Sequence, residues 1–211
     1  MLQNITINTQ SSIRIEDKKI IRFDPFRIEE DYNDADIIFI THSHYDHLSL
    51  EDLNKVRKED TIFIIPEKEV DKLTTLNINN NQIIKAKPNQ EYQVLDYKFY
   101  TIPSYNTNKP FHKREYNWLG YIIIINDKRY YIAGDTDITD ENKQVKCDIA
   151  FLPIGGTYTM DYKEAATLAN IIKPSVVIPI HYGSIVGQKE DAKKLKELVN
   201  NDIDVDVLIK E

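Results

Sequence analysis

The stretch Thr41-His42-Ser43-His44-Tyr45-Asp46-His47 carries three of the chain's five histidines and one carboxylate. It follows an apolar, β-branched run at 36–40, which predicts a buried strand. The segment after it predicts a helix over 49–58, with Ser49 and Asp52 at the spacing of a capping box. Imidazole nitrogens and carboxylate oxygens are the ligands of a borderline metal such as Zn²⁺. The stretch therefore predicts a metal site at the end of a strand.

Composition limits the kinds of protein this chain can be. A length of 211 residues and no linker-like segment predict one domain over residues 1–211. The net charge of −7 argues against a nucleic-acid or anionic-membrane binder. Cys147 stands alone, no signal peptide is visible, and the apolar runs are too short to cross a bilayer. We expect a cytoplasmic protein acting on a small molecule, with no nucleic acid and no membrane insertion; a homo-oligomer is compatible with this composition.

The order of predicted elements indicates an α/β fold. After short strands within 4–23, we expect strands at 36–40, 61–65, 82–86, 92–95, 97–102, 118–125, 129–133, 148–152, 175–180 and 205–209. We expect helices at 49–58, 66–73, 161–172 and 190–199, the third with Asp161 and Glu164 as a capping box. Strands followed by strand–helix units occur in each half, which predicts two mixed sheets packed together with helices outside.

Three of the buried-looking strands end on side chains that bind metals. One ends before His42, one before Asp135 and one before His181. In layered α/β folds, functional residues gather at strand ends. The candidate ligands are His42, His44, Asp46, His47, Asp135 and His181. They are too many for one tetrahedral ion with an open position, and they suit two ions that share Asp135. Asp24, before Pro25, either orients a ligand histidine or is a turn residue.

These motifs resemble the metallo-β-lactamase superfamily over essentially the whole chain. The resemblance implies a four-layer αβ/βα sandwich with the site at the edge between two sheets. It also implies that His42 and His44 bind one ion with a third histidine. Asp46, His47 and His181 would bind the other ion, and Asp135 would bridge. The segments 24–26, 154–161 and 181–183 are most similar to small hydrolases near ascorbate-phosphate lactonase and to the N-acyl-phosphatidylethanolamine phospholipase D type.

The chain departs from the family pattern at the third histidine. That residue should follow the strand at 97–102, where Asn106 stands. Three alternatives follow. The first site is weak and one ion binds; Asn106 is a ligand and favours manganese or another hard ion; or His112 folds back to complete the site. We therefore expect one or two divalent ions, with zinc favoured and manganese or iron as alternatives.

His112 also lies within a basic cluster formed by Lys109, Lys113 and Arg114. These side chains suggest a contact with the phosphate or carboxylate of an anionic substrate. Together with the resemblance, the residues predict a metal-dependent hydrolase of an ester, lactone or phosphodiester. In that hydrolase, Asp46 orients the attacking water and transfers its proton. A nuclease of the same superfamily and a non-catalytic binding module that keeps the fold are the alternatives.

Overall fold

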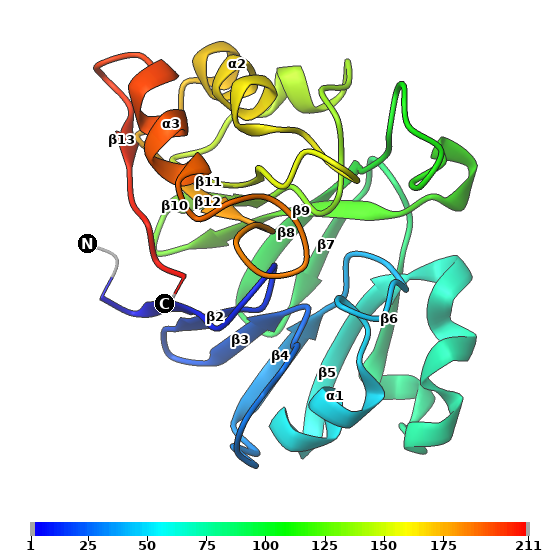
Figure 1. Ribbon diagram of the computed structural model, residues 1–211. Helices are drawn as coiled ribbons and strands as arrows, with labels where there is room; N and C mark the ends of the chain where they lie inside the picture. Colours follow the sequence, from blue (N-terminus) through cyan, green and yellow to red (C-terminus); the bar gives the residue numbers. More distant parts are fainter. Residues whose placement is uncertain (1–2, 210–211) are drawn as a thin grey trace. The chain divides into compact units, whose positions relative to one another are not determined.

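The computed structural model describes residues 3–209. These residues form two compact units, one of residues 3–87 with Ile209 and the other of residues 88–208. Each unit is built on one mixed β-sheet with helices beside it (Figure 1). The two mixed sheets agree with the predicted fold class. The expectation of a single domain over 1–211 stays a prediction.

The sheet of the first unit brings three chain segments together at one end of its strands. Its strands, in spatial order, are β1 (Ile5–Ile7), β2 (Ile13–Glu16), β3 (Ile20–Phe23), β4 (Ala35–Phe39), β5 (Arg57–Pro66) and β6 (Ile83–Ala86). The first three run antiparallel, and β3 to β6 run parallel. Ile13, Phe23 and Phe39 are neighbours in register. The turn before β2, the residues after β3 and the loop after β4 therefore lie at the same end of the strands.

The helical segments of the first unit are α1 (Leu50–Val56), η1 (Glu67–Leu76) and η2 (Asn80–Gln82). Ser49 caps α1, its hydroxyl accepting from the backbone N–H of Asp52 at 3.3 Å. The predicted capping box is only half formed, because the Asp52 carboxylate accepts instead from the backbone N–H groups of Arg27 and Ile28. The helix also ends earlier than predicted, since Arg57 is extended and begins β5. The helix expected at 66–73 is a 3₁₀ helix over 67–76.

The core of this unit joins β4 to the helices. Ile38 of β4, Phe63 of β5 and Leu53 and Val56 of α1 belong to one buried cluster. Each such side chain contributes about 1.5–3 kcal/mol by leaving water. This packing fixes the end of β4, and therefore the start of the histidine-rich loop.

The sheet of the second unit runs, in spatial order, β13 (Asp204–Val205), β12 (Val176–Ile180), β11 (Ile149–Pro153), β10 (Lys128–Ile132), β9 (Leu119–Ile125), β8 (Tyr97–Pro103) and β7 (Glu91–Val94). The strands from β10 to β13 are parallel, and those from β7 to β10 are antiparallel. Ile132 pairs with Phe151, and Pro153 pairs with Ile180. The residues that follow β10, β11 and β12 therefore leave the sheet at the same end, the carboxyl end of these parallel strands.

The helical segments of the second unit are α2 (Tyr162–Ile172), α3 (Asp191–Leu198), η3 (Arg114–Tyr116) and η4 (Asn142–Gln144). The capping box predicted at Asp161 and Glu164 is confirmed, with both reciprocal hydrogen bonds present at the start of α2. Helices α2 and α3 lie side by side (Figure 1). Within residues 3–209, no helix has the length and apolarity needed to cross a bilayer.

Candidate functional site

The loop after β4 brings His42 and His44 together. The Nε2 atom of His42 lies 3.1 Å from the Nδ1 atom of His44. Two nitrogens bound to one tetrahedral Zn²⁺ at their usual bond length are about 3.3 Å apart. On its other side, the His42 ring places Nδ1 3.0 Å from the Thr41 hydroxyl. The spacing of the two facing nitrogens therefore fits a pair of ligands to one metal ion.

Asp24 orients the second part of this loop. It is fully buried and follows β3 with a positive φ of 43°. Its carboxylate accepts from the Thr41 backbone N–H at 2.8 Å, from the Thr41 hydroxyl at 2.6 Å and from His47 Nδ1 at 2.7 Å. Because a carboxylate only accepts, His47 carries its proton on Nδ1 and keeps the Nε2 lone pair for a metal.

Burial and hydrogen bonding shift the pKa of the Asp24 carboxyl in opposite directions. Burial raises the pKa of the Asp24 carboxyl, and its bonds to His47 and Thr41 oppose that rise. The Nε2 atom of His47 lies 3.6 Å from Oδ2 of Asp46, whose side chain is almost buried. Asp46 and His47 thus present an oxygen and a nitrogen to the same point.

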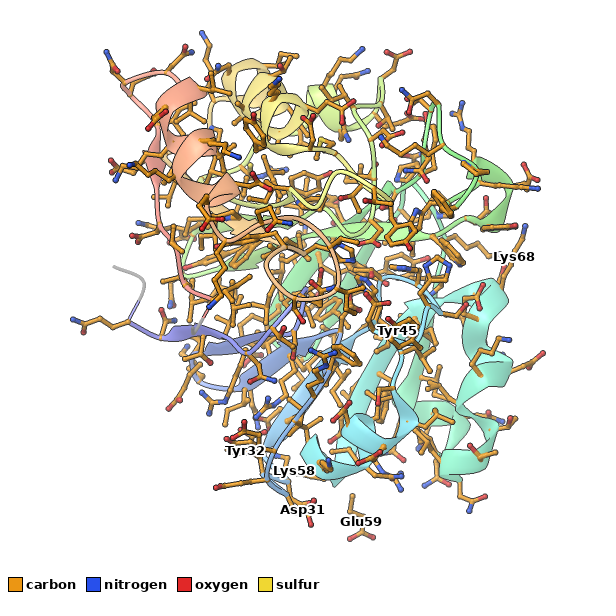
Figure 2. The ribbon with its side chains drawn as sticks, in the orientation of Figure 1. Asp31, Tyr32, Tyr45, Lys58, Glu59 and Lys68 are labelled. Carbon is orange, nitrogen blue, oxygen red and sulfur yellow. The ribbon has the colours of Figure 1, made fainter. Side chains whose placement is uncertain are left out.

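Tyr45 stands apart from the other residues of the loop. Its side chain is 66% exposed, and its ring stands at 75° to the Phe26 ring at a centroid distance of 5.9 Å. Figure 2 labels Tyr45. The histidine-rich loop therefore combines buried polar ligand atoms with one exposed aromatic ring.

Asp135 is the centre of the ligand set in the second unit. It follows β10, and its Oδ2 atom lies 3.2 Å from Nε2 of His112 and 3.2 Å from Nε2 of His181. All three residues are at least 97% buried. One carboxylate oxygen facing two imidazole nitrogens is the arrangement of a ligand shared between two metal ions.

The backbone around His181 is tightly constrained. His181 has a φ of 56°, which non-glycine residues seldom adopt and which concentrates at functional sites. Gly155, after the neighbouring strand β11, lies so close that a Cβ atom there would come 2.4 Å from the His181 carbonyl oxygen. Only glycine fits at this position, and its close approach helps to hold His181 beside Asp135.

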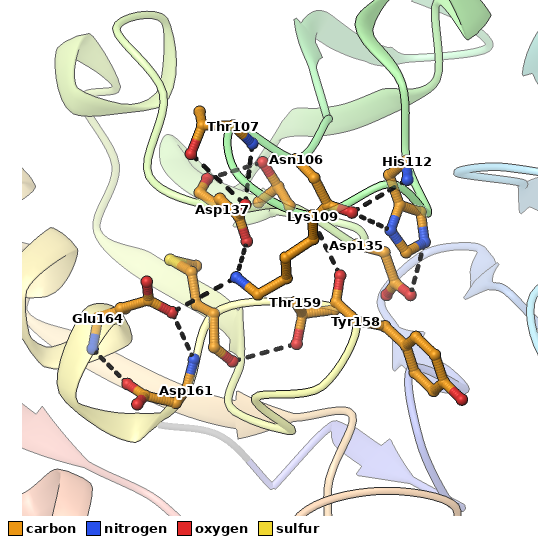
Figure 3. Close-up of polar contacts among 12 residues, drawn as sticks. Asn106, Thr107, Lys109, His112, Asp135, Asp137, Tyr158, Thr159, Asp161 and Glu164 are labelled. Carbon is orange, nitrogen blue, oxygen red and sulfur yellow. Dashed lines mark hydrogen bonds and ion pairs between the residues drawn. The ribbon is translucent and has the colours of Figure 1, made fainter.

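The Asn106 side chain orients the His112 ring and sets its tautomer. Its side-chain oxygen accepts from the backbone N–H of His112 and from His112 Nδ1, each at 3.0 Å, and its NH₂ group donates to the Tyr158 carbonyl at 2.9 Å (Figure 3). An amide oxygen only accepts, so Nδ1 of His112 carries the proton and Nε2 presents its lone pair to Asp135. Two lone-pair atoms at 3.2 Å repel each other unless a proton or a metal cation lies between them. This geometry fits metal ligands. It favours the alternative in which His112, and not Asn106, is the third ligand of the first site.

The basic cluster beside His112 is largely paired. Lys109 forms an ion pair with the buried carboxylate of Asp137 and lies 3.8 Å from Glu164 (Figure 3), and Arg114 pairs with Glu141. Asp137 also accepts from the backbone N–H of Thr107 at 2.9 Å, which anchors the loop that carries His112.

Lys113 differs from Lys109 and Arg114. It is exposed, and no ion pair involves it within residues 3–209. Of the three basic residues, Lys113 is therefore the one whose charge remains available to an anionic substrate. The pairing of the other two was missed from the sequence, because their acidic partners lie 27 to 55 positions further along the chain.

Replacing Asn106 by leucine tests its effect on His112. Without the amide oxygen, the His112 ring loses the partner that fixes its tautomer, and metal affinity should fall about 10–100-fold. Zinc titration of chelator-treated protein measures this change. Asn106→Asp, which keeps an acceptor at the same position, is the matched control and should lose less affinity; equal losses would contradict a positioning role.

Comparison with known proteins shows the family to which the chain belongs. Residues 3–182 match the model of the Beta-lactamase superfamily domain. A protein of Pyrococcus horikoshii named UPF0173 metal-dependent hydrolase is 30% identical over 215 residues, covering 92% of this chain and 91% of its own length.

Solved structures agree with these sequence matches. A protein from Parabacteroides distasonis, described as a metal-dependent hydrolase, is 33% identical with a TM-score of 0.83, covering 98% of this chain and 93% of its own. Igni18, a metallo hydrolase of Ignicoccus hospitalis, shares the fold at 24% identity, with a TM-score of 0.80 and coverage of 97% and 94%. The predicted metallo-β-lactamase fold is confirmed.

Proposed function

Because the chain belongs to the UPF0173 metal-dependent hydrolase family of the metallo-β-lactamase superfamily, we propose that it hydrolyses a small ester, lactone or phosphodiester with the help of divalent metal. The observation that carries this proposal is Asp135, whose Oδ2 atom faces the Nε2 atoms of both His112 and His181. Neither a packing role nor a surface role accounts for three buried ligand atoms at such spacing.

Each unit contributes ligands for divalent ions in this proposal. In the first unit these would be His42, His44, Asp46 and His47. In the second unit they would be His112, Asp135 and His181, with Asp135 shared between two ions. Each facing pair within a unit supports this role by its spacing. Imidazole and carboxylate ligands favour zinc, with manganese or iron as alternatives. A bound divalent ion lowers the pKa of water toward neutrality and polarises a carbonyl or phosphoryl oxygen.

Asp46 is the catalytic residue in this proposal. Its carboxylate lies in the ligand loop and is within 3.6 Å of His47 Nε2. There it orients the attacking water, accepts its proton and passes that proton to the leaving group. His47 does not take this role in this proposal, because Asp24 holds its Nδ1 proton and its Nε2 lone pair is assigned to a metal ion.

The substrate class rests on the sequence resemblance and on charge. Resemblance to the ascorbate-phosphate lactonase and N-acyl-phosphatidylethanolamine phospholipase D types favours a lactone or a phosphodiester. The exposed Lys113 supports an anionic group in the substrate. The net charge of −7 disfavours a nucleic acid.

Replacing Asp46 by alanine tests the proposed function. We expect wild-type protein loaded with zinc or manganese to hydrolyse at least one member of a panel of neutral and anionic esters, lactones and phosphodiesters. The variant should lose about 100–10,000-fold in kcat because proton transfer is lost. Steady-state kinetics with thermal melts as the folding check measure both effects.

Asp31→Ala is the matched control for this experiment, because it removes an exposed carboxylate of the same unit. It should leave kcat unchanged. Wild-type protein that is folded and metal-loaded, yet inert on the whole panel, would favour the non-catalytic binding module.

A further inference from the structure

A pocket of about 360 Å³ lies in the second unit, on one face of its sheet. It is bounded by strands β8, β9 and β10 and by the segment around η4, and its lining includes Tyr100, Ile102, Ile122, Arg129, Val145 and Lys146. Arg129 is near the amino end of β10, whereas Asp135 follows the carboxyl end of that strand. Pockets that bind small molecules measure about 300–1,000 Å³, so this one suits a single small organic molecule.

The Arg129 side chain has no acidic partner in this pocket. Within residues 3–209 it forms no ion pair or hydrogen bond, and its Nε atom is buried and unpaired. Asp148 accepts from the backbone N–H of Arg129 at 2.8 Å, not from its side chain. The guanidinium carbon lies 5.5 Å from the centroid of the Tyr100 ring, a cation–π contact that holds the group in place. Arg129 is half-buried and lines the pocket, so its terminal NH₂ groups, and not the enclosed Nε, are the donors available to a ligand.

The charge left unmatched in the pocket is positive. Lys146 also lines it, is exposed, and takes part in no ion pair in the part of the chain that the structure describes. Glu141 is the acidic residue of the lining, but its carboxylate is already engaged, one oxygen with Arg114 and the other with the Tyr105 hydroxyl at 2.7 Å. Arg129 and Lys146 therefore favour an anionic ligand.

The remaining lining favours an anion that carries an apolar body. Ile102, Ile122 and Val145 contribute hydrocarbon to the pocket, and Tyr100 adds an aromatic ring. An inorganic anion would leave these side chains uncovered, whereas an organic acid would bury apolar surface against them. The planar guanidinium fork matches the two oxygens of a carboxylate. The pocket therefore combines a site for a carboxylate with a site for a hydrocarbon or aromatic group.

We propose that this pocket binds a small organic carboxylate with an apolar or aromatic body. In this complex the terminal NH₂ groups of Arg129 hold the carboxylate, and Ile102 and Ile122 cover the apolar body. Lys146, which is exposed, adds a weaker attraction. The site is separate from the metal ligands of the second unit, so this inference does not depend on the proposed hydrolysis.

Benzoate, with benzamide as its neutral counterpart, tests the proposal on metal-loaded wild-type protein. In NMR spectra of the isoleucine and valine methyl groups, benzoate should shift the signals of Ile102, Ile122 and Val145, with a Kd in the millimolar range. Benzamide has the same shape but no charge, and should bind about 10-fold more weakly. Ile180, which precedes the proposed metal ligand His181, reports benzoate that binds at the metal instead.

Three variants test which cation holds the carboxylate. Arg129→Met should weaken benzoate binding about 10–100-fold, the value of a charge-assisted hydrogen bond, and leave the Tm level or raised, because an unpaired buried Nε is removed. Lys146→Met should weaken binding only about 2–3-fold, as expected for an exposed charge. Lys128→Met is the matched control, because it removes the same charge from the opposite face of β10. It should bind benzoate as wild type does.

Three results would overturn the inference. They are unshifted signals at Ile102, Ile122 and Val145 in tens of millimolar benzoate, equal binding of benzoate and benzamide, and equal affinity of wild type and a folded Arg129→Met. If that variant does not fold, the wild-type comparison of benzoate with benzamide still decides. A protein that hydrolyses no substrate yet shows these shifts with benzoate would contradict the proposed function and support this inference.

Discussion

Replacing Asp135 by alanine is expected to lower turnover by about a thousand-fold, equivalent to about 4 kcal/mol, and to reduce the metal bound per chain. The Asp135 carboxylate faces both His112 and His181 in the second unit, at 3.2 Å from each Nε2. Without it, both histidines lose the negative charge that favours a cation beside them. Elemental mass spectrometry and steady-state kinetics measure the two effects.

A second carboxylate of the same unit separates this effect from general loss of stability. Asp148 accepts from the backbone N–H of Arg129 at 2.8 Å and precedes β11, whereas Asp135 follows the neighbouring strand β10. Because β10 and β11 are parallel, the two carboxylates lie toward opposite ends of the strands. Asp148→Ala should lower the Tm but leave metal content unchanged. Full metal content in Asp135→Ala would refute the shared-ligand assignment.

Asp24→Ala is expected to cause the largest loss of stability. The change leaves His47 Nδ1 and the backbone N–H of Thr41 buried and without their acceptor. Removing one partner from such a network costs about 3–5 kcal/mol, which lowers the Tm by about 6–20 °C for a chain of this size. Zinc affinity should also fall about 10–100-fold, because the His47 ring loses its orientation. Thermal melts of metal-free and zinc-loaded protein measure both.

Asp60→Ala is the control for Asp24→Ala, since Asp60 is an exposed carboxylate of the same unit whose side chain is 80% accessible. Its free energy of unfolding should change by less than about 0.5 kcal/mol. A Tm for Asp24→Ala within a degree or two of the control would mean that Thr41 and His47 find other partners, and the role assigned to Asp24 would be wrong.

The sequence by itself determined where the strands end and which ligand-type residues follow them. Apolar runs of β-branched residues mark β4, β10 and β12. His181 directly follows β12, and His42 and Asp135 lie three positions beyond the ends of β4 and β10. Such runs depend on local alternation and burial, which a single sequence records. The capping box of α2 could be predicted for the same reason, since both of its partners lie within one turn of helix.

The tertiary structure decided the roles that depend on residues far apart in the chain. The sequence left Asn106 and His112 as alternatives, and only the folded loop turns Asn106 into the acceptor that orients His112 toward Asp135. The sequence predicted that Lys109 contacts the substrate, whereas in the folded chain it forms an ion pair with Asp137. In each case the deciding partner comes from another strand or loop, and no periodicity in the sequence encodes that proximity.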